Sequence, residues 1–176
     1  MRRFFEDLAL FLLGLIAALA VVSVFRIGGG IWQSVQLPVV FMALAVFYLK
    51  EDRLASLATG MGLGLDLVSV YSFFSWFIIV GGMVLTGWWL SKSVLTNRSL
   101  PSLLLLGLSM RLVFSFFEII VSRVGELVGS SVWYIMVFAE NWRMLFAFGI
   151  EMFLLVFVFV AHARLRGERT RMLTHL

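Results

Sequence analysis

The chain contains no cysteine, and only 14% of its 176 residues are charged. The absence of cysteine excludes disulfide bonds, thiolate metal sites and cysteine nucleophiles. The scarcity of charge accompanies a hydrophobic content of 62% and a mean hydropathy of +1.05. A soluble domain of this size could not bury so much apolar surface, so the sequence predicts a protein whose solvent is lipid.

Six apolar segments fill almost the whole chain, and each is long enough or nearly long enough to cross a bilayer. Six helices of about 20 residues account for about 120 residues, which leaves no room for a soluble catalytic domain. We therefore predict one all-α transmembrane domain, residues 1–176. The predicted helices cover residues 4–25, 31–49, 54–70, 73–91, 101–121 and 134–162, followed by a basic cytoplasmic tail, 163–176.

Three of these boundaries rest on particular residues. Residues 54–90 form one predominantly apolar run and would span about 55 Å as one helix, too long for a single crossing, so a turn is predicted between Ser69 and Ser75. Pro38 predicts a kink in the first half of the second helix. Residues 122–132 are predicted to form a loop, and the last helix is expected to begin between residues 133 and 142.

The basic residues alternate between the two sides of this six-helix topology. With the N-terminus inside, ten of the fourteen Lys and Arg residues lie on the cytoplasmic side: Arg2, Arg3, Lys50, Arg53, Lys92, Arg98, Arg164, Arg166, Arg169 and Arg171. This bias predicts that both ends of the chain are cytoplasmic. Because the charges lie between apolar segments, we interpret the net charge of +4 as a topology signal and as contact with anionic lipids at the cytoplasmic face, not as a nucleic-acid surface.

Six charged residues are predicted within the bilayer: Asp66, Arg111, Glu118, Glu140, Arg143 and Glu151. A charge inside a bilayer is energetically expensive and usually functional. At 1.5 Å per residue, Asp66, Arg111 and Glu151 lie about 15 to 18 Å from the inner ends of their helices, close to one level. We predict that Arg111 pairs with Asp66, with Glu151 or with both.

The other charged positions share helix faces with these groups. Glu118 follows Arg111 by seven residues, Glu140 and Glu151 are three turns apart, and Glu140 can pair locally with Arg143. The resulting stripes are expected to face the interior of the bundle. There they form either a buried ion-pair network that locks the helices together, or a polar cavity that serves as a substrate site or proton relay.

Small residues recur at four-residue spacing in the first and third predicted helices. Such positions allow a second helix to approach closely. They predict a helix-packing or partner interface at Gly14, Ala18, Ala58, Gly60, Gly62 and Gly64.

No catalytic motif is present in the sequence. It lacks the paired glutamates of intramembrane CAAX proteases, H-E-x-x-H, G-x-S-x-G and a glycine-rich phosphate loop with lysine. We therefore expect a protein that is not an enzyme and that uses no cofactor or metal.

The stretch Leu54–Ser69, with its spaced glycines before Asp66 and Leu67, resembles the corresponding segment of the MreD family of rod shape-determining membrane proteins. The six-helix layout with both ends inside is also similar. The resemblance implies a non-enzymatic subunit of the cell-wall elongation complex in the bacterial cytoplasmic (inner) membrane. Such a subunit would bind the bitopic protein MreC and help to place the transpeptidase and glycosyltransferase of peptidoglycan synthesis.

A second family is similar in size and layout. Substrate-binding S components of energy-coupling-factor vitamin transporters are also small, six-helix proteins with both ends inside. In that alternative, polar residues near the outer side would line a vitamin pocket: Glu118, Arg123, Glu126, Glu140, Asn141, Trp142 and Arg143. The short predicted loops favour the scaffold over the transporter.

Overall fold

The computed structural model of the chain describes residues 2–28, 35–68, 75–93, 98–127 and 141–165. The described residues form six α-helices and no strand, which confirms the predicted all-α class. The helices are α1 (Arg2–Gly28), α2 (Leu37–Tyr48), α3 (Glu51–Val68), α4 (Ser75–Ser93), α5 (Leu100–Leu127) and α6 (Asn141–Leu165).

Within the described residues, three helices are long and apolar enough to cross a membrane, which supports a membrane protein. The qualifying stretches are Arg3–Ser23 in α1, Leu100–Val121 in α5 and Leu145–Arg164 in α6. The other three predicted crossings are not supported by length and composition alone. Helix α2 has 12 residues, which span about 18 Å against a hydrocarbon core of about 30 Å.

Helix α2 lies at the centre of the fold, and eight of its residues are buried: Pro38, Val39, Val40, Met42, Ala43, Ala45, Val46 and Phe47. Burial on every side explains why its sequence is apolar all round. Pro38 stands in the first turn, where proline needs no backbone hydrogen bond and its fixed φ favours a helix start. The predicted kink at Pro38 is therefore wrong, because the helix begins at Leu37.

The helix boundaries follow the prediction at one turn and depart from it at another. Helix α3 ends at Val68 and α4 begins at Ser75, so the apolar run forms two helices, and the predicted turn itself lies outside the described residues. Helix α5 continues to Leu127, so Arg123 and Glu126 belong to a helix and not to the predicted loop. Helix α6 runs from Asn141 to Leu165, while residues 128–140 and 166–176 lie outside the described part, including most of the predicted tail.

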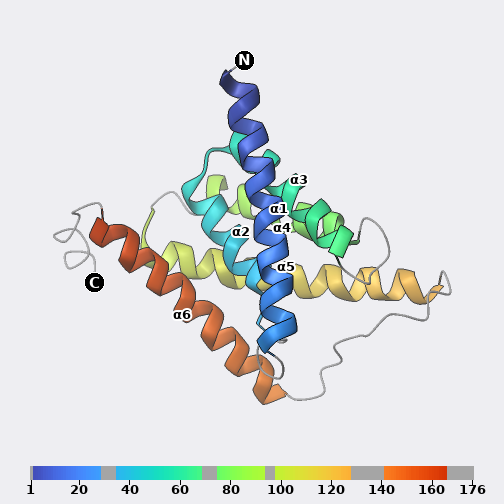
Figure 1. Cartoon of the computed structure of the whole chain (residues 1–176). Coiled ribbons are helices and arrows are strands. Elements are labelled where there is room, and N and C mark those ends of the chain that lie inside the picture. Colours follow the sequence, from blue (N-terminus) through green and yellow to red (C-terminus); the bar gives the residue numbers. More distant parts are fainter. Residues whose placement is uncertain (1, 29–34, 69–74, 94–97, 128–140, 166–176) are drawn as a thin grey trace.

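Helices α1 and α3 lie against each other at backbone distance (Figure 1). A Cβ atom added at Gly14 would overlap the carbonyl oxygen of Leu57, and one added at Gly60 would overlap the carbonyl oxygen of Phe11. A Cβ at Gly64 would lie 2.8 Å from the Cβ of Ala18. Only glycine allows this approach, in which dispersion and weak Cα–H hydrogen bonds act over the length of both helices.

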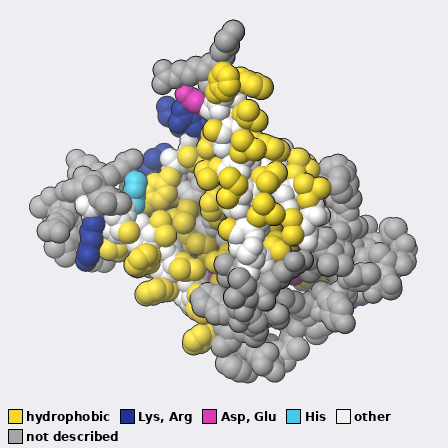
Figure 2. Space-filling model, in the orientation of Figure 1, with side chains coloured by type: hydrophobic (Ala, Val, Ile, Leu, Met, Phe, Trp, Pro, Cys, Tyr) yellow, Lys and Arg dark blue, Asp and Glu magenta, His cyan; other side chains and the backbone are white. Residues whose placement is uncertain are grey.

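Much of the outer surface of the described helices is apolar. Hydrophobic side chains cover the face shown in Figure 2, mainly over α1 and α6. Phe5 and Ile16 of α1 are 64% and 61% exposed, and Leu145 and Phe153 of α6 are 72% and 66% exposed. In Figure 1, α1, α5 and α6 run in different directions, so a bilayer would meet some of these helices at a tilt.

Candidate functional site

A buried charged centre joins α5, α6 and the residue that precedes α2. Glu151 of α6 has no exposed surface, and its Oε1 lies 3.2 Å from Nη1 of Arg111 on α5. The same oxygen accepts a 2.6 Å hydrogen bond from the backbone N–H of Gln36. Of the two partners predicted for Arg111, the structure therefore provides Glu151.

The guanidinium of Arg111 is enclosed by apolar and aromatic groups. Its side chain is only 12% exposed, and its Cζ lies 5.9 Å from the ring centroid of Phe114. Among the described residues, Oε2 of Glu151 has no hydrogen-bond partner, and Nη1 of Arg111 approaches Glu151 without hydrogen-bond geometry. Coulomb attraction in a region of low dielectric therefore holds this pair, and removing either partner would leave a buried charge uncompensated.

Glu118 lies two turns beyond Arg111 on α5, as the seven-residue spacing predicted. Its side chain is half-buried and forms no hydrogen bond or salt bridge within the described part of the chain. Arg111 is the charged group that acts on it electrostatically. The cluster thus holds one cation and two carboxylates, and only one of those carboxylates is directly paired.

Asp66 has a different role from the one predicted. It lies in the last turn of α3, and its two carboxylate oxygens accept the backbone N–H groups of Trp76 and Phe77, at 2.8 and 3.0 Å. These donors belong to the first turn of α4, where backbone N–H groups have no partner within the helix. Asp66 of α3 therefore caps the first turn of α4. Within the described residues, the salt bridge of Arg111 is to Glu151 and not to Asp66.

The remaining predicted charges cannot be placed in the centre. Glu140 lies outside the described residues, and the side chain of Arg143 does as well, although its backbone belongs to the first turn of α6. The predicted pair between Glu140 and Arg143 therefore also falls outside the described part. Of the six predicted intramembrane charges, the structure brings together Arg111 and Glu151, with Glu118 nearby.

The small-residue positions form helix-packing contacts, but within the chain. Gly14, Ala18, Gly60 and Gly64 are used between α1 and α3, and a Cβ at Gly62 would lie 3.0 Å from the Cα of Phe77 on α4. Ala58 is buried as well. Of the two uses predicted for these positions, helix packing or a partner interface, the structure shows helix packing within the chain.

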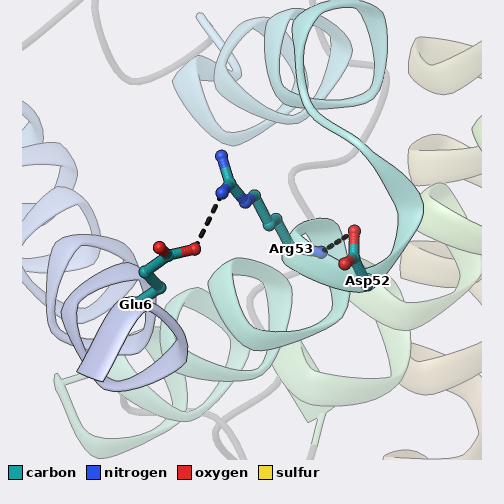
Figure 3. A network of polar contacts seen from close by, with 3 residues as sticks. All are labelled: Glu6, Asp52 and Arg53. Carbon is teal, nitrogen blue, oxygen red and sulfur yellow. Dashed lines mark hydrogen bonds and ion pairs between the residues drawn. The ribbon is translucent and has the colours of Figure 1, made fainter. Parts of the chain in front are cut away.

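Three contacts bring together helix ends that the basic residues assigned to the cytoplasmic side. Arg53 at the start of α3 forms a 2.7 Å salt bridge with Glu6 of α1, and its backbone N–H donates to Asp52 (Figure 3). Lys92 near the end of α4 lies 2.9 Å from Glu51 at the start of α3. The rings of Tyr48, ending α2, and His162, near the end of α6, have centroids 4.4 Å apart.

Sequence reasoning did not select Gln36, Glu6 or Glu51, although each positions a charged group. Gln36 acts through its backbone N–H, which carries no sequence signal. Glu51 directly follows Lys50 and Glu6 lies three residues after Arg3, so both belong to groups of opposite charges near helix ends, which are a detectable pattern. Side-chain hydrogen bonds from Lys92 and Trp88 hold the pKa of the Glu51 carboxyl below its ordinary value of 4.5.

The same end of the molecule contains an open cleft of about 640 Å³. It lies where α2 ends, α3 begins, α4 ends and α5 begins. Its wall is formed by Val46, Phe47, Leu49, Lys50, Glu51, Asp52, Leu54, Trp88, Ser91, Lys92, Arg98 and Leu106.

No group of three or more metal-ligating side chains occurs among the residues that the structure describes. Compared with known proteins, the chain matches no family model, no curated protein and no solved structure.

Proposed function

We propose that this chain is a multi-pass membrane protein with six crossings and both ends in the cytoplasm. The contacts Glu6–Arg53, Glu51–Lys92 and Tyr48–His162 support this topology. They join the ends of five helices at one end of the molecule, the end that the positive-inside rule makes cytoplasmic. The short helix α2 then crosses as the buried centre of the bundle, shielded from lipid by its neighbours.

The function that fits best is a non-enzymatic scaffold subunit of the bacterial cell-wall elongation complex, as the resemblance of Leu54–Ser69 to the MreD family implies. The single observation that carries this proposal is the internal use of buried charge. Glu151 is fully buried and held by Arg111 and Gln36, and Asp66 caps α4. Charges committed to internal contacts lock helices together, whereas a transport or catalytic site keeps groups free for a ligand.

A scaffold also needs surface for its partners. Because the small-residue faces of α1 and α3 are occupied within the chain, the exposed apolar faces of α1 and α6 are the docking surfaces in this proposal. The partner would be a bitopic, MreC-like protein, whose single transmembrane helix would lie against one of these faces. The wall-synthesis transpeptidase and glycosyltransferase would be recruited to the same complex.

The test is a pull-down of the tagged full-length chain from its native membrane in mild detergent, with the co-purifying proteins identified. We expect an MreC-like bitopic protein and the wall synthases. The test variant, Phe153→Ala, removes an exposed aromatic side chain from the proposed docking face of α6. The control variant, Phe114→Ala, removes a buried aromatic side chain and shows the effect of disrupting the core. Recovery of neither partner from a correctly folded wild-type protein would overturn the scaffold proposal.

One observation favours the alternative, a vitamin-transporter S component. Glu118 is half-buried beside Arg111 and has no direct partner in the described part of the chain. Such a group could receive a polar ligand between α5 and α6. Co-purification of paired ATPases with a T-component-like protein, and a vitamin bound by the wild type but not by Glu118→Gln, would replace the scaffold with the transporter.

A further inference from the structure

The cleft at the cytoplasmic end combines a basic rim with an apolar wall. Lys50, Lys92 and Arg98 contribute positive charge from three different segments of the chain. Leu49 and Trp88 contribute exposed apolar surface beside them, and the other apolar residues of the wall are buried. A volume of about 640 Å³ is in the range of sites that bind small ligands.

The positive charge of this cleft exceeds what its own carboxylates neutralise. Lys92 is paired with Glu51 at 2.9 Å and lies 4.4 Å over the ring of Trp88. Lys50 and Arg98 are exposed, and neither forms a salt bridge within the described residues. Asp52 is exposed, and one of its oxygens accepts the backbone N–H of Arg53. The three cations and two carboxylates of the lining leave one positive charge in excess, and Lys50 and Arg98, which have no salt bridge within the described residues, are available to an anion.

The apolar wall decides what kind of anion fits. A free phosphate would use the two cations but would leave the exposed apolar surface of Leu49 and Trp88 in water. An anionic phospholipid satisfies both parts, because its phosphate can bind Lys50 and Arg98 while its glycerol and upper acyl chains cover the apolar side chains. Trp88 lines the same cleft beneath Lys92, and indole rings prefer the membrane interface.

We propose that this cleft binds the headgroup of one anionic phospholipid from the cytoplasmic leaflet. Lys50 and Arg98 hold the phosphate, and Lys92, fixed over Trp88 and against Glu51, adds a third positive charge at the rim. The proposal rests on the membrane location and orientation proposed above and not on the scaffold role. If the lipid site were absent, the result expected of the partner pull-down would not change. If the pull-down recovered no partner, the lipid site would still stand.

The experiment measures the thermal stability of the purified full-length chain in neutral detergent, with added lipid. Phosphatidylglycerol is compared with phosphatidylcholine of the same acyl chains, and with soluble glycerol 1-phosphate at the same concentration. We expect phosphatidylglycerol alone to raise Tm. A rise of equal size with glycerol 1-phosphate would overturn the lipid assignment, and no rise with phosphatidylglycerol would overturn the site.

Two double variants with the same change in net charge locate the effect. Lys50→Gln with Arg98→Gln removes the free cations of the cleft, whereas Arg3→Gln with Arg164→Gln removes two exposed cations elsewhere on the same predicted side. We expect the first pair to lose at least half of the lipid-dependent rise in Tm and the second to keep it. Equal losses in both variants would show general charge attraction and overturn the cleft.

The cleft variants are suited to this test because Lys50 and Arg98 are exposed and have no partner to lose within the described residues. Lipid counting by native mass spectrometry gives a second readout that does not depend on stability. We expect one phosphatidylglycerol molecule to remain on the wild type after delipidation. The absence of a retained lipid at low collision energy would overturn the proposal.

Discussion

Arg111 and Glu151 form a salt bridge of 3.2 Å between α5 and α6, with Glu151 fully buried. The carboxylate oxygen that faces Arg111 also accepts the Gln36 backbone N–H, so one atom joins three separate segments of the fold. A pair placed in this way fixes the position of α6 against the core formed by α2 and α5. It also makes α6 sensitive to the loss of either charge.

Replacement of Arg111 by Leu leaves Glu151 buried without a counter-charge. We expect a loss of about 3–5 kcal/mol in the free energy of unfolding, the usual effect of breaking a buried ion pair from one side. The double variant Arg111→Leu with Glu151→Leu should recover most of that loss, since it buries no charge. Unfolding in mixed detergent micelles measures both values.

Arg164→Leu is the control for this cycle, because it removes an exposed arginine from α6 and should change stability by no more than about 0.5 kcal/mol. If the single and double variants at Arg111 and Glu151 were equally unstable, the pair would not be the source of the effect. If all of them remained fully stable but lost a bound ligand, the centre would be a binding site and not a structural lock.

Asp66→Ala removes both acceptors for the first turn of α4. We expect a loss of about 1–2 kcal/mol, the upper part of the range for helix N-caps, because two N–H groups lose their partner. Asp66→Asn retains one acceptor and should lose less. Hydrogen exchange at Trp76 and Phe77 measures the effect locally, and Asp52→Ala, at an exposed acid, is the control. Unchanged exchange in Asp66→Ala would contradict the cap.

Glycines at packed and open positions should respond to alanine with opposite signs. Gly14→Ala and Gly60→Ala force a Cβ into the backbone of the facing helix, so we expect losses of about 1–3 kcal/mol from overpacking. Gly81→Ala and Gly149→Ala meet nothing within 4 Å and should gain up to about 1 kcal/mol, because alanine is the better helix former. Thermal unfolding of the four variants tests the contrast, and a loss at all four would contradict it.

The number of helices and their class could be predicted because apolar length and turn residues are local signals. The serines between residues 69 and 75 separated α3 from α4 in the prediction, whereas the polar residues after Val121, among them Arg123 and Glu126, concealed the continuation of α5. The number of membrane crossings could not be predicted in the same way. Helix α2 is short, and its apolar sequence fits burial against other helices as well as contact with lipid. Periodicity does not distinguish these two apolar environments.

The candidate site could be predicted only in part. Depth along the helices brought Arg111 and Glu151 to one level, and the structure places them in contact. The same argument put Asp66 at that level by counting from residue 54, whereas α3 begins at Glu51 and Asp66 lies in its last turn, where it caps α4. Gln36 could not be found from sequence at all, because its donor is the backbone. Pairings between distant segments depend on how helices pack, which a single sequence does not specify.

The last prediction concerns the acid dependence of the Glu51–Lys92 contact. The folded pKa of Glu51 lies below the ordinary value of 4.5, first through the hydrogen bond from Lys92 and then through that from Trp88. The contact therefore contributes its full stability above pH 4.5 and loses it as the pH falls through the lowered folded value. Because Glu51 is fully exposed, the contribution is small and falls with added salt.

We expect Lys92→Gln to move the pKa of Glu51 upward toward 4.5, and Trp88→Phe to move it by a smaller amount. Carboxyl carbon NMR of labelled glutamate in the detergent-solubilised chain measures the titration directly. Arg53→Gln serves as the control, because that arginine is paired with Glu6 and not with Glu51. If Arg53→Gln raised the pKa as much as Lys92→Gln did, the lowering would come from the general positive field of this end, and the specific link between α3 and α4 would be excluded.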